Sequence, residues 1–453
     1  MKGSTKALAD FAAGLKHEEL DAVLLAGFRK YLLDGIGCGL HGHSQPWSRI
    51  MNRFVKEQKG KREAALWLEN FRGPCANIAL GLGVMIHAFD FDDYHNAKVH
   101  PGAPIIPAIL TVGESVGASG RDVLTAMVAG YETMIRISLA TGPTASRSRG
   151  WHLTGTTGTF GAAAAAGRLY GFNGEQMANA LGLAGTQSSG LWAFTADGSM
   201  SKRFHAGRAA QSGVMAAELV RKGFTGPTSI LEAEDGGFCR ATSDEVDLSL
   251  ITKGLGSRFE SGQTNIKPYA CCASSHSAVD AVLALKEQHR FEAAEIEKVV
   301  VKTARGVQLQ CGFEYQAKGV VQAQMSIQYI VAVVLLENAA LLEQFSDARI
   351  ADPAVMALAR RVEFVVDPEI DKLYPKQFPN RVEIILKGGR RFETRIDFAK
   401  GSVEQPMSFD EVAGKFRSLS SGAMTESSAE RIVETVDRLE KLRDIRELTR
   451  LLA

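Results

Sequence analysis

The chain has 453 residues, of which 45% are hydrophobic and 23% charged, and its formal net charge is +1. This composition is typical of a soluble globular protein, and the length predicts two domains because it exceeds what one hydrophobic core usually serves. The near-zero charge gives no reason to expect nucleic acid or an anionic membrane as a partner. No apolar run reaches the roughly 20 residues that span a bilayer, and the N-terminus lacks a signal-peptide core. Scattered cysteines without Cys-x-x-Cys spacing indicate reduced thiols and a cytoplasmic location.

Apolar residues recur at helical spacing over most of the first 260 residues. The pattern predicts helices in this order: two within 5–40, then 62–72, 75–88, two within 113–142 that break at 117–120, 174–186 and 204–222. The Gly/Thr run Trp151–Phe160 leads into the Ala run Gly161–Ala166, which we interpret as a buried helix. A phosphate-binding loop is the alternative, but the Lys-Ser/Thr ending is missing.

The stretch from His87 to His100 stands out in this half of the chain. Its fourteen residues hold three His, three Asp and one Lys between two apolar segments. Titratable groups between buried segments are costly unless they are paired or used, so we expect a functional site, with a solvated acidic loop as the alternative. Asp92, Asp93 and His95 suggest a metal site only weakly, because Asp-x-x-His lacks a fourth ligand. We therefore expect no metal.

The composition changes near residue 260, where β-rich runs begin to alternate with helical patterns. Strands are predicted at 297–303, 361–366, 382–386 and 391–396, and helices at 277–288, 325–340 and 352–361. Gly388-Gly389 between the last two strands is a hairpin signal. Helical patterns return from Ser408 and end in a charged helix at 427–446. The order is therefore helical, then α+β, then helical.

Four segments carry a resemblance to a known family: His87–Gly102, Asp197–Ala210, Gly223–Pro227 and Lys267–His276. In this order they resemble the 2-methylcitrate dehydratase family (MmgE/PrpD), which also holds cis-aconitate decarboxylase and iminodisuccinate epimerase. The resemblance implies a mainly α fold, with an all-helical domain formed from both chain ends and an inserted α+β lid. Together with the composition shift, it predicts a helical domain of residues 1–265 and 405–453 and a lid of residues 266–404. It also implies a homodimer that needs no organic cofactor.

The resemblance also implies the site residues. Asp90, His100, His152 and Lys267 are the expected catalytic residues, and Lys202, Arg203, Tyr94 and His276 the expected substrate-binding residues. Two positions depart from the decarboxylase branch: Tyr94 stands where that branch has Thr, and Leu309 stands where it has a Tyr of the site. Tyr315 lies near the second position.

The family reactions form or quench a carbanion next to a carboxylate, which requires cations, a base and charge stabilisation. His100 is the first choice for acid/base work because imidazole titrates near neutrality, and Asp90 orients it or acts as the base. Lys267, held extended by the following proline, clamps a carboxylate or donates a proton. We expect Asp90, His100, Lys202 and Lys267 to converge between the domains.

Three of the expected site residues keep structural alternatives. Arg203 binds substrate or makes a structural salt bridge. His152, which follows a tryptophan, reaches the site or packs in the core. His276 binds substrate or caps the next helix.

The sequence thus predicts an enzyme that abstracts a proton α to a carboxylate of a small di- or tricarboxylate. Dehydration of a 2-methylcitrate-like acid and epimerisation of an iminodisuccinate-like acid stand close together. Decarboxylation comes third because of Tyr94 and Leu309. The alternative from another class is a non-catalytic dimer that binds a carboxylate metabolite.

Overall fold

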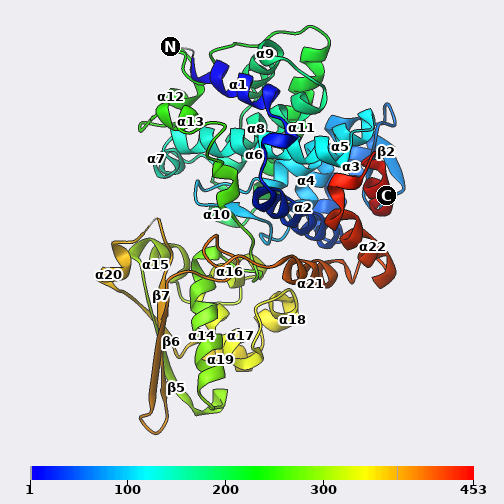
Figure 1. Cartoon of the computed structure of the whole chain (residues 1–453). Coiled ribbons are helices and arrows are strands. Elements are labelled where there is room, and N and C mark those ends of the chain that lie inside the picture. The colour runs from blue at the N-terminus through cyan, green and yellow to red at the C-terminus, as the bar shows by residue number, and fades with distance from the viewer. Residues whose placement is uncertain (1–2, 375) are drawn as a thin grey trace. The chain divides into compact units, whose positions relative to one another are not determined.

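The computed structural model describes residues 3–374 and 376–453. The chain forms two compact units (Figure 1): a helical unit, Met1–Thr264 with Ser408–Ala453, and a mixed unit, Asn265–Met407. The boundaries expected from the sequence, 265/266 and 404/405, lie within a few residues of these. The fold is mainly α with an α+β second unit, as expected from the pattern.

Helices are the main elements of the helical unit. They are α1 (Ser4–Gly14), α2 (Ala22–His43), α3 (Pro46–Glu57), α4 (Cys75–Ile86), α5 (Gly102–Val116), α6 (Gly120–Ala140), α7 (Pro143–Ser148), α8 (Leu153–Leu169), α9 (Gly174–Gly185), α10 (Phe194–Asp197), α11 (Ser201–Arg221), α12 (Phe238–Thr242), α13 (Ser249–Thr252), α21 (Phe409–Ser420), α22 (Glu426–Asp437) and α23 (Arg446–Leu452). Within the described residues, α6 alone is long and apolar enough to cross a membrane, and 94% of its apolar window is buried inside the protein. This burial is that of a core helix.

The predicted break at 117–120 is confirmed. Helix α5 ends at Gly117, which adopts φ +66°, and Ser119 then caps α6 with its side chain. Two other predictions in this unit are wrong. Residues 62–72 form a hairpin of β1 (Ala64–Leu66) and β2 (Phe71–Gly73), because Leu68 and Asn70 take positive φ angles that end any helix. The charged final helix is interrupted between α22 and α23.

Small residues allow α4, α8 and α11 to approach one another closely. A Cβ added to Gly207 of α11 would lie 2.4 Å from the carbonyl oxygen of Leu80 in α4. A Cβ added to Gly213 would lie 2.6 Å from the backbone nitrogen of Ala163 in α8. Most of α8 is buried, which confirms the predicted buried Ala helix. The small residues of α8 therefore face neighbours in the same unit.

The mixed unit is built on a four-stranded sheet, with the order β6 (Val362–Val366), β5 (Ile296–Thr303), β7 (Asn380–Leu386), β8 (Arg391–Ile396). Strands β5 and β6 are parallel, and the other neighbours are antiparallel. Its helices are α14 (His276–Gln288), α15 (Arg305–Cys311), α16 (Val320–Met325), α17 (Ile327–Glu337), α18 (Asp347–Ile350), α19 (Pro353–Ala359) and α20 (Pro368–Asp371). Figure 1 shows α14, α17 and α19 on one side of the sheet. The predicted hairpin at Gly388-Gly389 joins β7 to β8, with Gly389 at φ +83°.

Candidate active site

The acidic stretch of the sequence forms the loop between α4 and α5. His87 is the C-cap residue of α4, and His100 lies directly before Pro101, the N-cap residue of α5. Asp90 adopts φ +55°, which is uncommon for a residue other than glycine. Such a conformation persists only where the surroundings enforce it, and it is frequent at functional sites. Lys415 of α21 provides part of that support: its ammonium donates to the Phe91 carbonyl (2.7 Å) and pairs with the buried Asp34 (2.6 Å).

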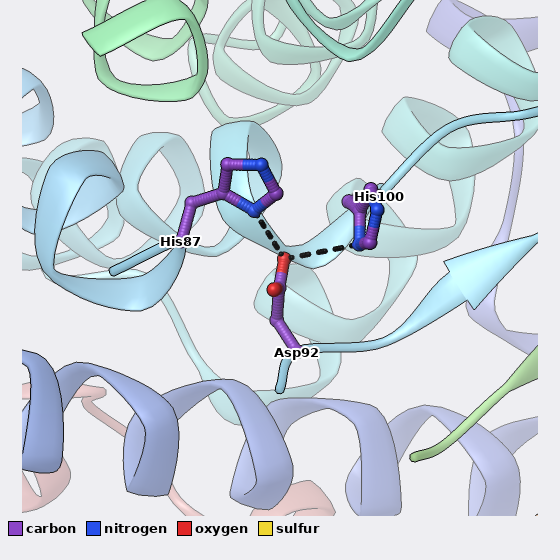
Figure 2. Close-up of side chains that lie close together, drawn as sticks. All are labelled: His87, Asp92 and His100. Carbon is purple, nitrogen blue, oxygen red and sulfur yellow. Dashed lines mark hydrogen bonds and ion pairs between the residues drawn. The ribbon is translucent and has the colours of Figure 1, made fainter. Parts of the chain in front are cut away.

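Asp92 links two imidazole rings in this loop. Figure 2 shows its carboxylate between His87, at the end of α4, and His100. The Oδ2 atom of Asp92 lies 2.9 Å from Nδ1 of His87 and 3.5 Å from Nδ1 of His100. Asp92 and His87 are buried, whereas 16% of the His100 side chain is exposed. A buried carboxylate thus lies behind the partly exposed ring of His100.

The hydrogen bonds assign the protons of both rings. Nδ1 of His100 lies 2.9 Å from the carbonyl oxygen of Asp93, and a carbonyl oxygen only accepts, so this Nδ1 carries the hydrogen. Nε2 of His100 is then the nitrogen that takes or gives a proton in a reaction. Nδ1 of His87 likewise donates to Asp92.

The same contacts bear on metal binding. His87, Asp92 and His100 lie close enough for a metal ion. Ligation through Nδ1 of His100 would require that nitrogen to lose its hydrogen and face the Asp93 carbonyl with a lone pair. The metal set considered from the sequence is not assembled, because Asp93 binds Tyr131 while His95 accepts from the Ala97 backbone. The cluster therefore fits a hydrogen-bonded network better than a metal site.

Electrostatics separate the charges of this network. Burial alone would raise the pKa of Asp92, but the His87 and His100 rings outweigh it and hold that pKa well below its usual range. Burial lowers the pKa of His87 to about 4, although Asp92 acts in the opposite direction. At neutral pH the Asp92 carboxylate is therefore ionised and the His87 ring neutral.

Asp93 behaves differently from its neighbour. Its Oδ2 accepts from the Tyr131 hydroxyl (2.7 Å) and its Oδ1 from the Gly102 backbone (2.9 Å). Burial and the charge of Asp92 raise the pKa of Asp93 to about 8. Two adjacent buried carboxyl groups thus hold different protonation states near pH 7, which is a recurring feature of acid/base sites.

Asp90, His100 and Lys202 come together on the partly exposed side of the network. The ammonium of Lys202, in the first turn of α11, lies 2.9 Å from Oδ1 of Asp90, and Nε2 of His100 lies 3.8 Å from the same oxygen. Between 16% and 19% of each side chain is exposed. A cation, a carboxylate and a proton-accepting nitrogen are therefore accessible together.

His152 lies in the same neighbourhood. It precedes α8 and is buried, and its ring centroid is 6.1 Å from that of His87. Burial, together with His87, Lys202, His205 and His100, holds the pKa of His152 well below its usual range. His87 and His205 belong to this cluster, and sequence reasoning did not select either. The signals that point to them are their positions: His87 is the first residue of the acidic stretch, and His205 lies three residues after Lys202.

The remaining predicted residues have other surroundings. Arg203 makes a cation–π contact with Trp47 (4.5 Å) and donates to the Ala88 carbonyl (3.3 Å), which favours a structural role. Tyr94 is half-buried on the short strand β3 (Tyr94–His95). Lys267 and His276 are both buried in the mixed unit. Nε2 of His276, at the first position of α14, lies 3.2 Å from the Cys271 carbonyl oxygen.

Leu309, which departs from the decarboxylase branch, and the nearby Tyr315 also lie in the mixed unit. Leu309 on α15 is 81% exposed. Tyr315 is buried, and its hydroxyl donates to the Ile350 carbonyl (2.7 Å). The Tyr315 hydroxyl is therefore already engaged inside the mixed unit.

Comparison with known proteins covers the chain almost from end to end. Family models match residues 6–251 (MmgE/PrpD N-terminal domain) and 269–441 (MmgE/PrpD C-terminal domain). The cis-aconitate decarboxylase of Aspergillus terreus is 29% identical, over 99% of this chain and 96% of its own length. That of Mus musculus is 26% identical, over 100% and 94%. The 2-methylcitrate dehydratase of Escherichia coli K12 is 24% identical, over 80% and 78%.

These relatives are named enzymes, and the two family models together span both structural units. The resemblance seen in the four sequence segments is confirmed by these matches. The chain is therefore an enzyme that belongs to the MmgE/PrpD family.

Proposed function

We propose that this enzyme is a lyase acting on a small di- or tricarboxylate through proton transfer at the carbon α to a carboxylate. The observation that carries the proposal is the accessible group of Asp90, His100 and Lys202, in which Nε2 of His100 lies 3.8 Å from a carboxylate that pairs with the Lys202 ammonium. An anionic substrate requires a cation, and a weakly acidic C–H requires a positioned base.

Each residue has a distinct task in this proposal. The Lys202 ammonium binds a substrate carboxylate, while Nε2 of His100 takes a proton from carbon or delivers one to it. The positive charge that forms on the His100 ring is stabilised by Asp92 behind it, 3.5 Å from Nδ1. Asp90 keeps Lys202 and His100 on the same side of the loop. We assign to Lys267 the binding of a second substrate carboxylate, as the family resemblance implies.

The relatives bear on which reaction occurs. Sequence reasoning ranked decarboxylation third, yet decarboxylases match over 99–100% of the chain and dehydratases over 80–85%. This difference favours a cis-aconitate-like substrate and moves decarboxylation level with dehydration. Tyr94 and Leu309 continue to favour dehydration or epimerisation, because both depart from the decarboxylase pattern.

One experiment separates the three reactions. The enzyme is incubated with citrate, 2-methylcitrate, cis-aconitate and iminodisuccinate isomers in deuterated water and followed by NMR. Decarboxylation removes a carboxylate signal, releases carbon dioxide and places deuterium on the product carbon. Dehydration produces a new alkene signal. Epimerisation introduces deuterium at the α-carbon while all carboxylate groups remain. An enzyme that converts none of these acids and exchanges no α-proton would contradict the proposal.

A further inference from the structure

A second pair of histidines lies beside the proposed site. Nδ1 of His152, at the start of α8, lies 3.0 Å from Nδ1 of His205 on α11. At this distance one nitrogen carries the hydrogen and the other accepts it. His152 is buried, and His205 is half-buried. The pair therefore connects a buried ring to one that reaches the protein surface.

Two glycines make room for this pair. A Cβ on Gly155 would lie 3.1 Å from Cβ of His205 and 2.6 Å from the Ser189 carbonyl oxygen. Gly190, at φ +127°, accepts a hydrogen bond from the His152 backbone nitrogen (3.0 Å), and a Cβ there would lie 3.3 Å from the His205 ring. The backbone is thus shaped around the contact between the rings.

The environment keeps the two rings neutral. The ring centroids of Trp192 and Phe194 lie 5.3 and 5.5 Å from that of His152. Burial lowers the pKa of His205 as well as that of His152. The charged and titratable groups that act on His152 are His87, Lys202, His205 and His100. A neutral pair has one hydrogen between its two Nδ1 atoms, which is the arrangement that passes a proton along.

We propose that His205 is a positioning residue that relays protons between solvent and the proposed site through His152. The proposal rests on the function proposed above, in which the site gives or takes a proton in each turnover. Dehydration and epimerisation, for example, each take one proton and give one back in every turnover, so a relay that carries a proton out and another in ends each turnover in its starting state.

The relay conserves protons and charge. Water delivers a proton to Nε2 of His205, Nδ1 of His205 passes its hydrogen to Nδ1 of His152, and Nε2 of His152 releases its hydrogen to the site. Each ring ends neutral with one hydrogen. The proton that the site takes in the other half of the turnover leaves by the reverse passage, which restores the starting tautomers. Nε2 of His87, buried and without a hydrogen-bond partner in the part of the chain that the structure describes, is a further acceptor in this cluster.

The kinetic test compares His205→Gln with His205→Ala. Glutamine keeps a hydrogen-bonding group beside His152 but does not carry protons. Both variants should lower kcat about tenfold to 100-fold with KM within a factor of two, using the acid of the four-member panel that the parent converts. Added imidazole should restore His205→Ala and leave His205→Gln unchanged. His43→Gln, a partly exposed histidine paired with Glu69, is the matched control and should keep the parent kcat.

Two kinetic results would overturn the relay: a His205→Gln variant with the parent kcat, or a His205→Ala variant that imidazole does not restore. A measurement without substrate keeps the test independent of the proposed function. The measurement is ¹⁵N NMR of the histidine rings of the parent at pH 7, with the His205 signals assigned by their loss in His205→Gln. His152 and His205 should both be neutral, and one should carry its hydrogen on Nδ1 and the other on Nε2. Hydrogens on both Nδ1 atoms would contradict the pair, whereas an inactive parent with complementary tautomers would contradict only the proposed function.

Discussion

Asp92 organises the proposed site at the scale of single residues. One carboxylate oxygen reaches the buried ring of His87 and the accessible ring of His100, so the orientation of both rings depends on one buried charge. Because the hydrogen of His100 is on Nδ1, its Nε2 atom is free of hydrogen, and this atom is the one that lies near Asp90. Asp93, the next residue, holds its proton near neutral pH because burial, together with the nearby charge of Asp92, raises its pKa to about 8.

Replacing His100 tests the acid/base assignment. We expect His100→Ala to lower kcat by about 10²-fold or more, the usual scale for a lost acid/base group. The exposed Lys6, which pairs with Asp10 on α1, provides the control, and Lys6→Ala should change turnover little. Steady-state kinetics on the converted acid measure both variants. Turnover of His100→Ala within a few-fold of the parent would remove His100 from the mechanism.

Asp93 makes a prediction about stability and pH. Its pKa rises from 3.8 to about 8 on folding, so between these values the folded state holds a proton that the unfolded state has lost. Stability from this group therefore falls as pH rises toward 8, by up to about 1.4 kcal/mol per pH unit. Asp93→Asn should remove this decrease of the unfolding free energy between pH 6.5 and 8. The control Asp235→Asn, at an exposed residue, should leave the decrease in place.

Urea unfolding at several pH values measures the slope. The window above pH 6.5 avoids the buried His87 and His95, whose pKa values of about 4 affect stability only below the ordinary histidine value of 6.5. Parallel slopes for the parent and Asp93→Asn would show that Asp93 is ionised throughout.

At the scale of elements, the position of α11 decides where Lys202 lies. Helix α11 packs on α4 through two glycines: a Cβ on Gly83 would lie 2.6 Å from Cα of Gly207. Helix α4 ends at His87, so the same contact relates the acidic loop to the lysine that pairs with it. Close helix packing and site geometry are thus parts of one arrangement.

Gly207→Ala should disturb that arrangement. The new methyl would lie 2.4 Å from the Leu80 carbonyl oxygen and 2.8 Å from a methyl of Val84, so the helices must separate. We expect a loss of about 1–3 kcal/mol in unfolding free energy, the usual scale of overpacking, and reduced kcat as Lys202 moves. Gly414→Ala, on α21 with nothing within 4 Å of the added Cβ, should instead stabilise by about 0.5–1 kcal/mol. Equal unfolding midpoints for the two variants would contradict this account.

At the scale of the whole molecule, the family resemblance predicts a homodimer. Ile50 of α3 and Met200 and Phe204 at the start of α11 are 60%, 49% and 43% exposed. With Trp47 they line a cavity of about 280 Å³. Exposed apolar groups gathered in this way commonly mark an interface. We therefore expect a second copy to bind at this surface.

Light scattering on the purified protein tests the assembly. The chain has a mass of 48.8 kDa, so we expect about twice that value at micromolar concentration. Phe204→Glu should yield monomers because it buries a charge in the interface, and Val23→Glu, at a residue that is 84% exposed on α2, should keep the parent mass. A parent that is monomeric would contradict the dimer, and a dimeric Phe204→Glu would contradict its location.

Local signals explain how much of this protein is readable from the sequence alone. Periodicity and Gly117 define α5 and α6, alternation and Gly388-Gly389 define the β7–β8 hairpin, and the dense His/Asp stretch marks the site. These features depend on neighbours within a few residues. Residues 62–72 were misread because a short buried apolar run fits a helix or a strand equally well, and the positive φ of Leu68 leaves no trace in periodicity.

Only the tertiary structure decided which side chains meet. Lys202 pairs with Asp90, which lies 112 positions earlier in the sequence, and His205 meets His152, which lies 53 positions earlier. These contacts form because glycine and alanine residues allow α4, α8 and α11 to pack closely together. Asp92 is ionised and Asp93 protonated near neutral pH because of burial and the groups around each of them. The sequence alone does not distinguish these two neighbouring aspartates. Residue types can be read along a chain, but pKa values and proton positions arise from contacts through space.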